Sequence, residues 1–208
     1  MPFTPATRFS SQYLAAALFA LSISGCALSP QQIAIKPQIV VEPRDYGKQQ
    51  QLIVETLDER SNDILGVRGG VYKDTSIIQL ENAFSKAITR EVIKALSSWG
   101  FDPIETSSQK LPEFTLSVQS IDYETNDRTV ANTITTTIKM ALKVQWGKTA
   151  YAGNYSASRS RTFIKAPTEA ANTRLINELS SAVLQEIFDD PELAAFLQKQ
   201  VANQKSAN

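Results

Sequence analysis

Cys26 is the residue whose type and position point most directly to covalent chemistry. It is the only cysteine among 208 residues, and it follows the small residues Ser24 and Gly25. A thiolate is a nucleophile that can accept a covalent group. A single thiol leaves no intrachain disulfide and no cysteine-rich zinc site. The position of Cys26 near the amino terminus therefore favours modification of the thiol itself.

The segment before Cys26 has the pattern of an export signal. Arg8 precedes an apolar run over residues 13–21, which is too short for a membrane span of ~20 residues but suits a signal peptide. Ile23-Ser24-Gly25-Cys26 resembles the lipobox of bacterial lipoproteins, which implies cleavage between Gly25 and Cys26 and acylation of Cys26. The alternatives are an ordinary secretory signal and an uncleaved inner-membrane anchor. Ala27 follows in place of aspartate, and by resemblance to the enterobacterial sorting rule this favours the outer membrane.

The rest of the sequence offers little for catalysis. The chain has no histidine, so the commonest general base and metal ligand is absent. Its 21 Lys and Arg residues equal its 21 Asp and Glu residues, whereas a nucleic-acid-binding surface usually has a basic excess. We expect no enzyme, no metal, no cofactor and no nucleic-acid partner. The rival hypothesis is an envelope hydrolase that uses Asp58, Glu59 and Asp63.

Residues 58–70, DERSNDILGVRGG, form the most unusual local sequence. Glycines permit positive φ values and the segment carries charges of both signs, so it is a candidate partner-binding loop. Its ligand would be an anionic glycan, a peptidoglycan peptide or a protein. The other interpretation, which we prefer, is a structural turn whose arginines pair with neighbouring carboxylates. The candidate residues are Asp58, Arg60, Asp63, Gly66 and Arg68.

A second candidate surface is basic. Arg159 and Arg161 share one face of a predicted strand, and Lys139 and Lys143 lie on the strand before it. Such a face would suit lipid headgroups or cell-wall acids. Charge that protects the surface or the edge of a sheet explains the same pattern, and we prefer that explanation.

Hydrophobic periodicity predicts the elements that position these residues. Residues 133–146 alternate, with every even position except Thr136 apolar, and Gly147-Lys148 suits a tight turn into a return strand over 151–163. The spacing of apolar residues predicts a helix over 76–99, capped by Ser76 and ended by Gly100, and a second helix from Thr168 to Ile187. Other expected elements are strands over 33–41, 52–57 and 114–123, the last with a bulge near Ser120, and a short helix from Asp190-Pro191.

This order of elements predicts an α+β two-layer sandwich, with a mostly antiparallel sheet and the two longer helices on one face. A composition of 42% hydrophobic and 20% charged residues suits a globular domain. We expect a signal peptide over 1–25, a lipidated cysteine and tether over 26–32, a periplasmic domain over 33–200 and a flexible tail over 201–208.

The order of motifs resembles the YajG family of bacterial lipoproteins. The matching features are the lipobox at Cys26, Asp58-Glu59-Arg60 followed by Leu65-Gly66-Val67-Arg68, the helix ending in Trp99-Gly100-Phe101, and the long hairpin. The resemblance covers nearly the whole mature chain. It implies a lipoprotein of the Gram-negative outer membrane and implies little about activity.

The leading functional hypothesis is a lipid-anchored, non-enzymatic binding or scaffold module on the periplasmic face of the outer membrane. Its partners would be the membrane, through the lipid, and envelope proteins or the cell wall. The alternatives are an accessory factor in cell-wall synthesis or outer-membrane assembly, a carrier of a lipid or small ligand, and the carboxylate-based hydrolase.

Overall fold

The fold is one mixed β-sheet with helices on one face. The structure is a computed structural model that describes residues 29–68, 75–127 and 132–207. Within these residues the sheet has eight strands, in the order β1-β4-β3-β6-β2-β5, with β7 and β8 continuing from β6. The elements are β1 Gln31–Ile33, β2 Gln51–Asp58, β3 Ile64–Val67, β4 Ile77–Leu80, α2 Phe84–Ser98, β5 Asp102–Ile104, β6 Glu113–Asp127, β7 Asn132–Trp146, β8 Thr149–Phe163, α3 Glu169–Asp189 and α4 Pro191–Ala207.

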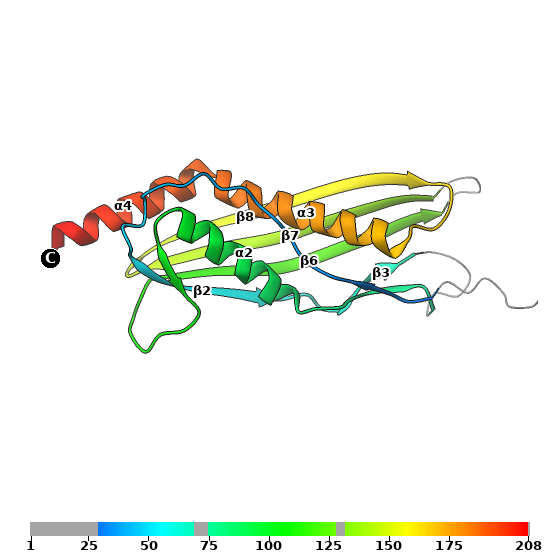
Figure 1. The fold of residues 1–208 in the computed structure, drawn as a ribbon, viewed down its shortest axis with the longest axis horizontal. Coiled ribbons are helices and arrows are strands. Elements are labelled where there is room, and N and C mark those ends of the chain that lie inside the picture. The colour runs from blue at the N-terminus through cyan, green and yellow to red at the C-terminus, as the bar shows by residue number, and fades with distance from the viewer. Residues whose placement is uncertain (1–28, 69–74, 128–131, 208) are drawn as a thin grey trace, which may run out of the picture.

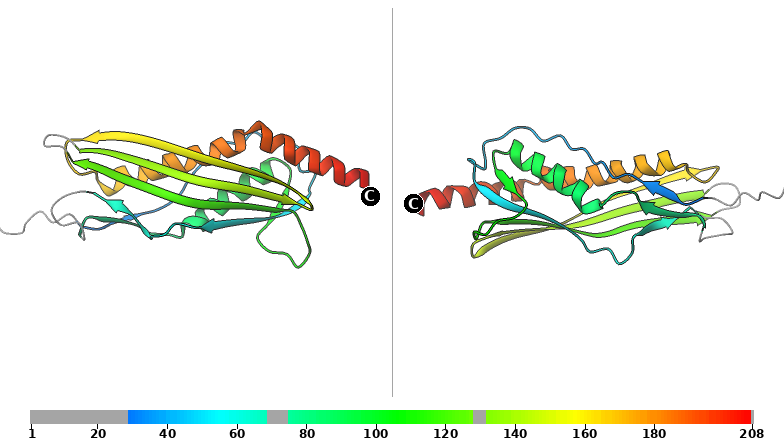
Figure 2. Two further views of the ribbon diagram at one scale, coloured as in Figure 1. Left: turned by 180° about the vertical axis from the view of Figure 1, so that it is seen from behind. Right: turned by 60° about the horizontal axis from the view of Figure 1, so that its bottom comes forward.

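The domain is elongated (Figure 1). Helices α2 and α3 lie on the same face of the sheet, and the view from behind shows the opposite face without helices (Figure 2). We call the end with β1, β3 and β4 the tether end, because the described chain begins there. Helix α4 extends from the other end, which we call the far end.

The α+β class and the two helices on one face agree with the prediction, but the expectation of a mostly antiparallel sheet was wrong. β2 pairs in parallel with both β5 and β6, and β1 pairs in parallel with β4. The physical reason lies in the connections. Helix α2 stands between β2 and β5, and a crossover of this kind returns the chain to the edge where it started and gives parallel neighbours. The short strands β3, β4 and β5 carried too few residues to show a period.

The long hairpin is confirmed. β6, β7 and β8 have 15 residues each and span about 50 Å at 3.3 Å per residue. The even-numbered residues of β7 from Ile134 to Trp146 are buried. The predicted bulge is present as a register shift between Val118 and Ser120. Gly147 has a φ of +60°, the value needed at the first position of a two-residue hairpin turn.

The predicted helix over 76–99 was wrong in its first third. Residues 77–80 form β4, and α2 begins at Phe84, after Ala83, which provides no side-chain cap. Ile77 and Leu80 are three residues apart, a spacing that fits a helix face, but they pair with β1 and β3 instead. The predicted end is confirmed. Gly100 has a φ of +79°, and Phe101 N–H donates to Leu96 O at 3.1 Å, as in a Schellman motif.

The carboxyl-terminal helices begin where the sequence predicted. The Thr168 hydroxyl caps α3 by accepting from Ala171 N–H, and α4 starts at Pro191. Helix α4 is longer than expected: it continues to Ala207 through most of the segment predicted as a flexible tail. Its buried residues Leu193, Leu197 and Val201 recur every four positions, so one side of α4 packs on the domain.

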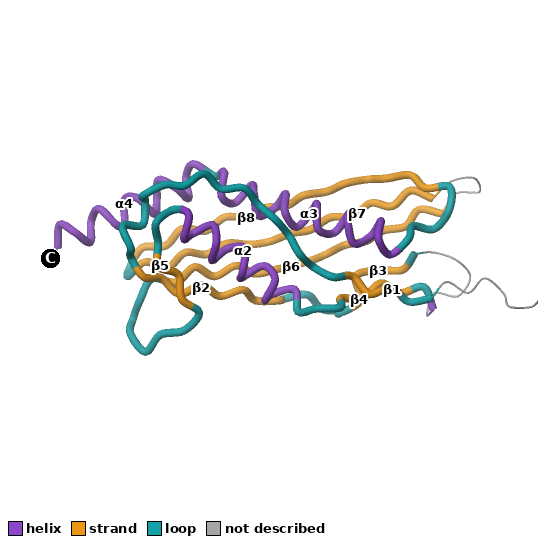
Figure 3. Tube along the Cα trace, viewed as in Figure 1, coloured by secondary structure: helices purple, strands orange, loops and turns teal. Residues whose placement is uncertain are grey.

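Residues 34–41, which we call the strap, run along α3 from the tether end toward the far end (Figure 3). Three polar side chains of α3 bind its backbone. The Asn177 side chain accepts from Lys36 N–H at 2.6 Å, the Ser181 hydroxyl from Gln38 N–H at 2.9 Å, and the Gln185 side chain from Val40 N–H at 3.1 Å.

The strap and the helix match in spacing. Four helical residues rise about 6 Å, and two extended residues advance about 6.6 Å. Asn177, Ser181 and Gln185 therefore meet every second residue of the strap. On the other side the Asn82 side chain accepts from Ile35 N–H at 2.6 Å and donates to Ile35 O at 3.0 Å. The strap is thus fixed to the helical layer through its main chain.

One prediction concerns Gly66, which lies in β3 against Tyr123. A Cβ at position 66 would stand 2.6 Å from Tyr123 Cβ, so Gly66→Ala forces the strand and Tyr123 apart. We expect a loss of about 1–3 kcal/mol in the free energy of unfolding, measured by urea denaturation. Gly147→Ala is the control for an added methyl group, since no atom lies within 4 Å there and only its positive φ is strained. An unchanged urea midpoint in Gly66→Ala would show that β3 and Tyr123 accommodate the methyl group without cost.

Candidate functional site

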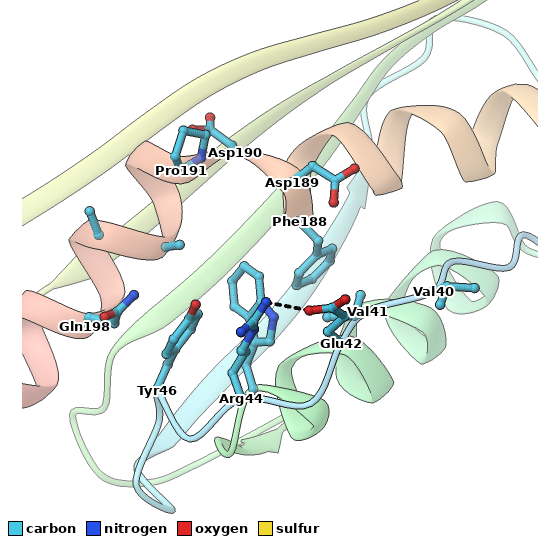
Figure 4. Close-up of a pocket in the computed structure, with 13 residues that line it drawn as sticks. Val40, Val41, Glu42, Arg44, Tyr46, Phe188, Asp189, Asp190, Pro191 and Gln198 are labelled. Atoms are coloured by element: carbon cyan, nitrogen blue, oxygen red, sulfur yellow. Dashed lines mark hydrogen bonds and ion pairs between the residues drawn. The ribbon is translucent and has the colours of Figure 1, made fainter.

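A cavity opens at the far end, between the end of the strap, the end of α2 and the junction of α3 with α4 (Figure 4). We call it the junction cleft, and its volume is about 640 Å³. This volume is within the range of small-molecule and peptide sites. The lining residues are Val40, Val41, Glu42, Arg44, Tyr46, Trp99, Phe188, Asp189, Asp190, Pro191, Ala194, Ala195 and Gln198.

Aromatic rings form the base of the junction cleft. Tyr46 meets Trp99 edge-to-face with centroids 5.5 Å apart, and Trp99 meets Phe188 in the same way at 5.1 Å. Phe188 then stacks on Phe114 of β6 at 6.3 Å. Edge-to-face rings pack in preferred geometries and resist rearrangement. The base is therefore a fixed apolar surface rather than a gap that can collapse.

Main-chain hydrogen bonds hold the wall of the cleft on α2. Arg44 N–H donates to Ser98 O at 2.8 Å, Gly47 N–H to Trp99 O at 2.9 Å and Gln49 N–H to Gly100 O at 2.7 Å. These carbonyls at a helix end have no partner within the helix. Residues 44–49 satisfy them, and this contact fixes Tyr46 beside Trp99.

The rim of the cleft is polar. Arg44 and Glu42 form an ion pair with 2.5 Å between Nη2 and Oε2, and both side chains are exposed. Asp189 is exposed and accepts a hydrogen bond from Gln185 at 2.9 Å. An apolar base with charged groups around the mouth can bind an apolar side chain and orient a polar group beside it. We find no arrangement of nucleophile and base in the cleft.

A partly buried polar contact holds the α3–α4 junction against β8. The Tyr151 and Tyr155 hydroxyls both donate to Asp190 Oδ2, at 2.6 and 2.7 Å. Asp190 Oδ1 accepts from Glu192 N–H at 2.7 Å and so caps α4. Burial raises the pKa of Tyr151 to about 12, and its hydrogen bond to Asp190 acts in the same direction. Burial likewise raises the pKa of Tyr155.

The junction should be sensitive to acid. Burial favours the neutral form of Asp190, but the hydrogen bonds from the two tyrosines and from the amides of Glu192 and Leu193 outweigh it and lower its pKa below the ordinary value of 3.8. A carboxyl with a lowered folded-state pKa stabilises the fold above its unfolded pKa, and this stabilisation is lost as the pH falls through the folded value. Asp58 behaves alike, because its hydrogen bond from Arg60 lowers its pKa.

We therefore expect the urea midpoint to stay level between the ordinary carboxyl pKa and the ordinary tyrosine pKa of about 10, and to fall as the pH drops from about 4 toward 2. Asp190→Asn should show a shallower fall, because the titrating group is gone. Parallel curves for the wild type and the variant would contradict the assignment to Asp190. Glu105→Gln, a change of an exposed carboxyl, is the control.

The candidate loop over 58–70 is not one loop in the described residues. Asp58 ends β2 and Gly66 lies within β3. Arg60 donates to both oxygens of Asp58, at 2.7 and 2.6 Å, and its guanidinium carbon lies 5.7 Å from the centre of the Phe84 ring. The Arg60 side chain is only 6% exposed. These contacts are those expected of the structural interpretation.

Of the other residues in this candidate set, Asp63 stays close to Asp58 and Arg60, whereas Arg68 does not line the same pocket. Asp63 shares a shallow pocket of about 450 Å³ with Asp58 and Arg60. Arg68 is buried and donates to Ser29 O, and its amide donates to Ser76 O at 2.9 Å. Arg68 therefore binds the start of the described chain instead of facing a partner. Gly69 and Gly70 lie outside the described residues.

Arg159 and Arg161 are close together, as predicted, but they are not a free basic pair. Both donate to Glu178 Oε2 of α3, Arg161 at 2.9 Å. Lys139 Nζ lies 3.8 Å from Asp122 Oδ2. The arginines are on the helix side of β8, whereas Lys139 and Lys143 are on the odd-numbered, exposed face of β7. The four cations therefore do not form one surface.

Cys26, Gly25 and the predicted signal peptide lie outside the described residues. Within the described residues no helix is long and apolar enough to cross a bilayer. The junction cleft could not be predicted from the sequence, because its walls come from three separate segments, residues 40–46, 99 and 188–198. The only local signal was the helix break at Asp190-Pro191.

The comparisons with known proteins identify the class as bacterial lipoprotein. The chain belongs to the Lipoprotein_16 family, described as uncharacterized lipoprotein, whose model matches residues 37–198. No curated protein sequence matches the chain.

Similar solved structures include a Xanthomonas campestris protein of family DUF330, with 12% identity over 84% of this chain and 99% of that chain and a TM-score of 0.45. A putative neuraminyllactose-binding hemagglutinin homolog from Helicobacter pylori has 10% identity over 82% and 100%, with a TM-score of 0.46. A putative lipoprotein from Caulobacter crescentus has 9% identity over 73% and 91%, with a TM-score of 0.34. At these scores the likenesses carry no functional argument.

Proposed function

We propose that this lipoprotein is anchored in the outer membrane through acylated Cys26 and binds an envelope component in the junction cleft, as a non-enzymatic binding or scaffold module of the YajG type. The observation that carries the proposal is that the cleft and the tether lie at opposite ends of the molecule. Helix α3 begins beside Gln32, whose N–H donates to Glu169, and ends in the cleft at Asp189. Its 21 residues separate the two ends by about 31 Å.

The start of the described chain supports anchoring close to the domain. Ser29 is three positions after Cys26, so the two residues are at most about 11 Å apart. Ser29 is bound by Arg68, and the buried Gln31 side chain bonds Pro167 O at 3.1 Å and Asn172 at 2.7 Å. A lipid on Cys26 would therefore enter the membrane next to the tether end and leave the cleft open to a partner.

Binding is a better proposal than hydrolysis for these residues. Asp58 is paired with Arg60, and Glu59 accepts from the Ser117 hydroxyl at 2.9 Å. Carboxylates held by such bonds serve the fold. A role as an accessory factor in cell-wall synthesis or outer-membrane assembly remains within the binding hypothesis, since it specifies the partner and not the site.

The proposal can be tested by photo-crosslinking in Gram-negative cells. Val40 and Ala195 line the cleft and are exposed, so a photoreactive residue at either position should give the same adducts. Lys143, exposed on the opposite face, is the matched control. Ala194→Trp, which fills the cleft, should remove the adducts. Adducts that are equal at Lys143, or that survive Ala194→Trp, would refute a partner in the cleft.

A further inference from the structure

β8 forms an edge of the sheet along its whole length. Its 15 residues pair with β7 in an unbroken register from Trp146–Thr149 to Asn132–Phe163. No other strand in the described part of the chain pairs with β8. An edge strand exposes a row of main-chain donors and acceptors that can pair with another chain.

The hairpin turn shows which main-chain groups are free. A two-residue turn closes on a hydrogen-bonded pair, here Trp146 and Thr149. Odd-numbered residues of β8 therefore direct their N–H and C=O groups to β7, and even-numbered residues from Ala150 to Thr162 direct theirs outward. In the described structure no hydrogen bond beyond the β7 pairing reaches these outward groups.

Natural sheets protect such an edge with charge, proline, a bulge or a short strand, and of these devices β8 has only the charge of Arg159 and Arg161. It contains no proline and no lysine, its register has no bulge, and it is long. The outward residues also have small side chains: Ala150, Ala152, Asn154, Ser156, Ser158, Ser160 and Thr162. None of these side chains carries a charge, so charge on β8 is confined to Arg159 and Arg161 on its other face.

The charges beside the edge indicate the chemistry of the occupant. Arg159 and Arg161 both bind the one oxygen Glu178 Oε2, so two positive charges share one negative charge. Their side chains are 45% and 34% exposed. A carboxylate on the helix side of an added strand would balance the remaining charge through charge-assisted hydrogen bonds.

We propose that the free edge of β8 accepts an extended segment of a partner protein as an added strand, with a carboxylate side chain placed opposite Arg159 or Arg161. A second copy of this chain is a poorer occupant. Two-fold pairing of β8 with itself is antiparallel, so it would place the two tether ends at opposite ends of the joined sheet. Each copy would also bring the same excess of positive charge.

The test is amide hydrogen exchange on the full mature lipoprotein in detergent micelles. The probe is the acetylated and amidated peptide Thr-Val-Glu-Val-Glu-Val-Thr, which alternates as a strand requires. We expect it to slow exchange at the outward amides of Ser156, Ser158 and Ser160 about tenfold, because they become hydrogen-bonded. The controls are the same peptide with Lys for Glu, and a peptide N-methylated at every second residue. Neither should protect these amides.

Each other outcome overturns a stated part of the proposal. If no peptide slows exchange, the edge is not a binding site. If the Lys and Glu peptides protect the amides equally, the added strand needs no carboxylate. In the double variant Arg159→Glu, Arg161→Glu, we expect the Lys peptide to protect these amides better than the Glu peptide. If the amides are already protected in a manner that depends on protein concentration, a second copy occupies the edge. The cleft is not involved, so crosslinking from Val40 is independent of this result.

Discussion

Cys26→Ser is expected to abolish lipid attachment and to remove the protein from the outer-membrane fraction. The reason is that the chain has one thiol, so no other residue can take the acyl-bearing group. Each buried methylene of an acyl chain contributes about 0.8 kcal/mol, and stable anchoring needs two chains or a second signal. Loss of the modified residue therefore costs the whole anchor.

The measurement is labelling of cells with an alkyne analogue of palmitate, followed by separation of inner and outer membranes. Wild-type protein should carry the label, and intact mass should fit a chain that starts at Cys26 with its acyl groups. Ser24→Ala keeps a small residue before the cysteine and is the matched control, with labelling unchanged. Label on the Cys26→Ser protein, or an unmodified cysteine in the wild type, would refute the anchor.

Asp190→Ala is expected to destabilise the fold by about 3 kcal/mol, since it removes the acceptor of two tyrosine hydroxyls and the cap of α4. Tyr155 is 7% exposed, so water cannot easily replace the lost acceptor. The variant should also loosen the α3–α4 junction and with it one wall of the cleft.

A double-mutant cycle separates the two contributions. In a background with Tyr151→Phe and Tyr155→Phe there are no hydroxyls to leave unpaired. The same Asp190→Ala change should then cost only the cap, about 1 kcal/mol. Urea unfolding measures all four proteins. An equal cost of Asp190→Ala in both backgrounds would show that the tyrosine contacts add no stability.

The parts of the fold that could be predicted from the sequence are the long elements, in which the hydrophobic pattern repeats several times. β7 alternates over its whole length, and the stripe of α3 repeats through Leu175, Leu179 and Val183, so each pattern has one interpretation. β1, β3, β4 and β5 have only three or four residues. In so short a segment, a pair such as Ile77 and Leu80 fits a helix or a strand. The pairing with β1 and β3 determines that it is a strand.

The candidate sites show the same limit. Arg60 beside Asp58 is a local contact two residues apart, and the structural interpretation of that segment needed only the local sequence. The junction cleft needed contacts that no local pattern contains, such as Val40 with Gln185 across 145 positions. Trp99 ends the helix predicted over 76–99, but its contacts with Tyr46 and Phe188 join segments far apart in the sequence.

The fixing of the strap to α3 has a mechanical consequence. The strap starts at the tether end and runs along the axis of α3. Its hydrogen bonds to Asn177, Ser181 and Gln185 follow one another along that direction. A force that draws the lipid away along the long axis of the protein loads these bonds together, in shear, rather than opening them one after another. With the anchor and the partner proposed above, the strap would therefore bear tension along its axis without unravelling from its first residue.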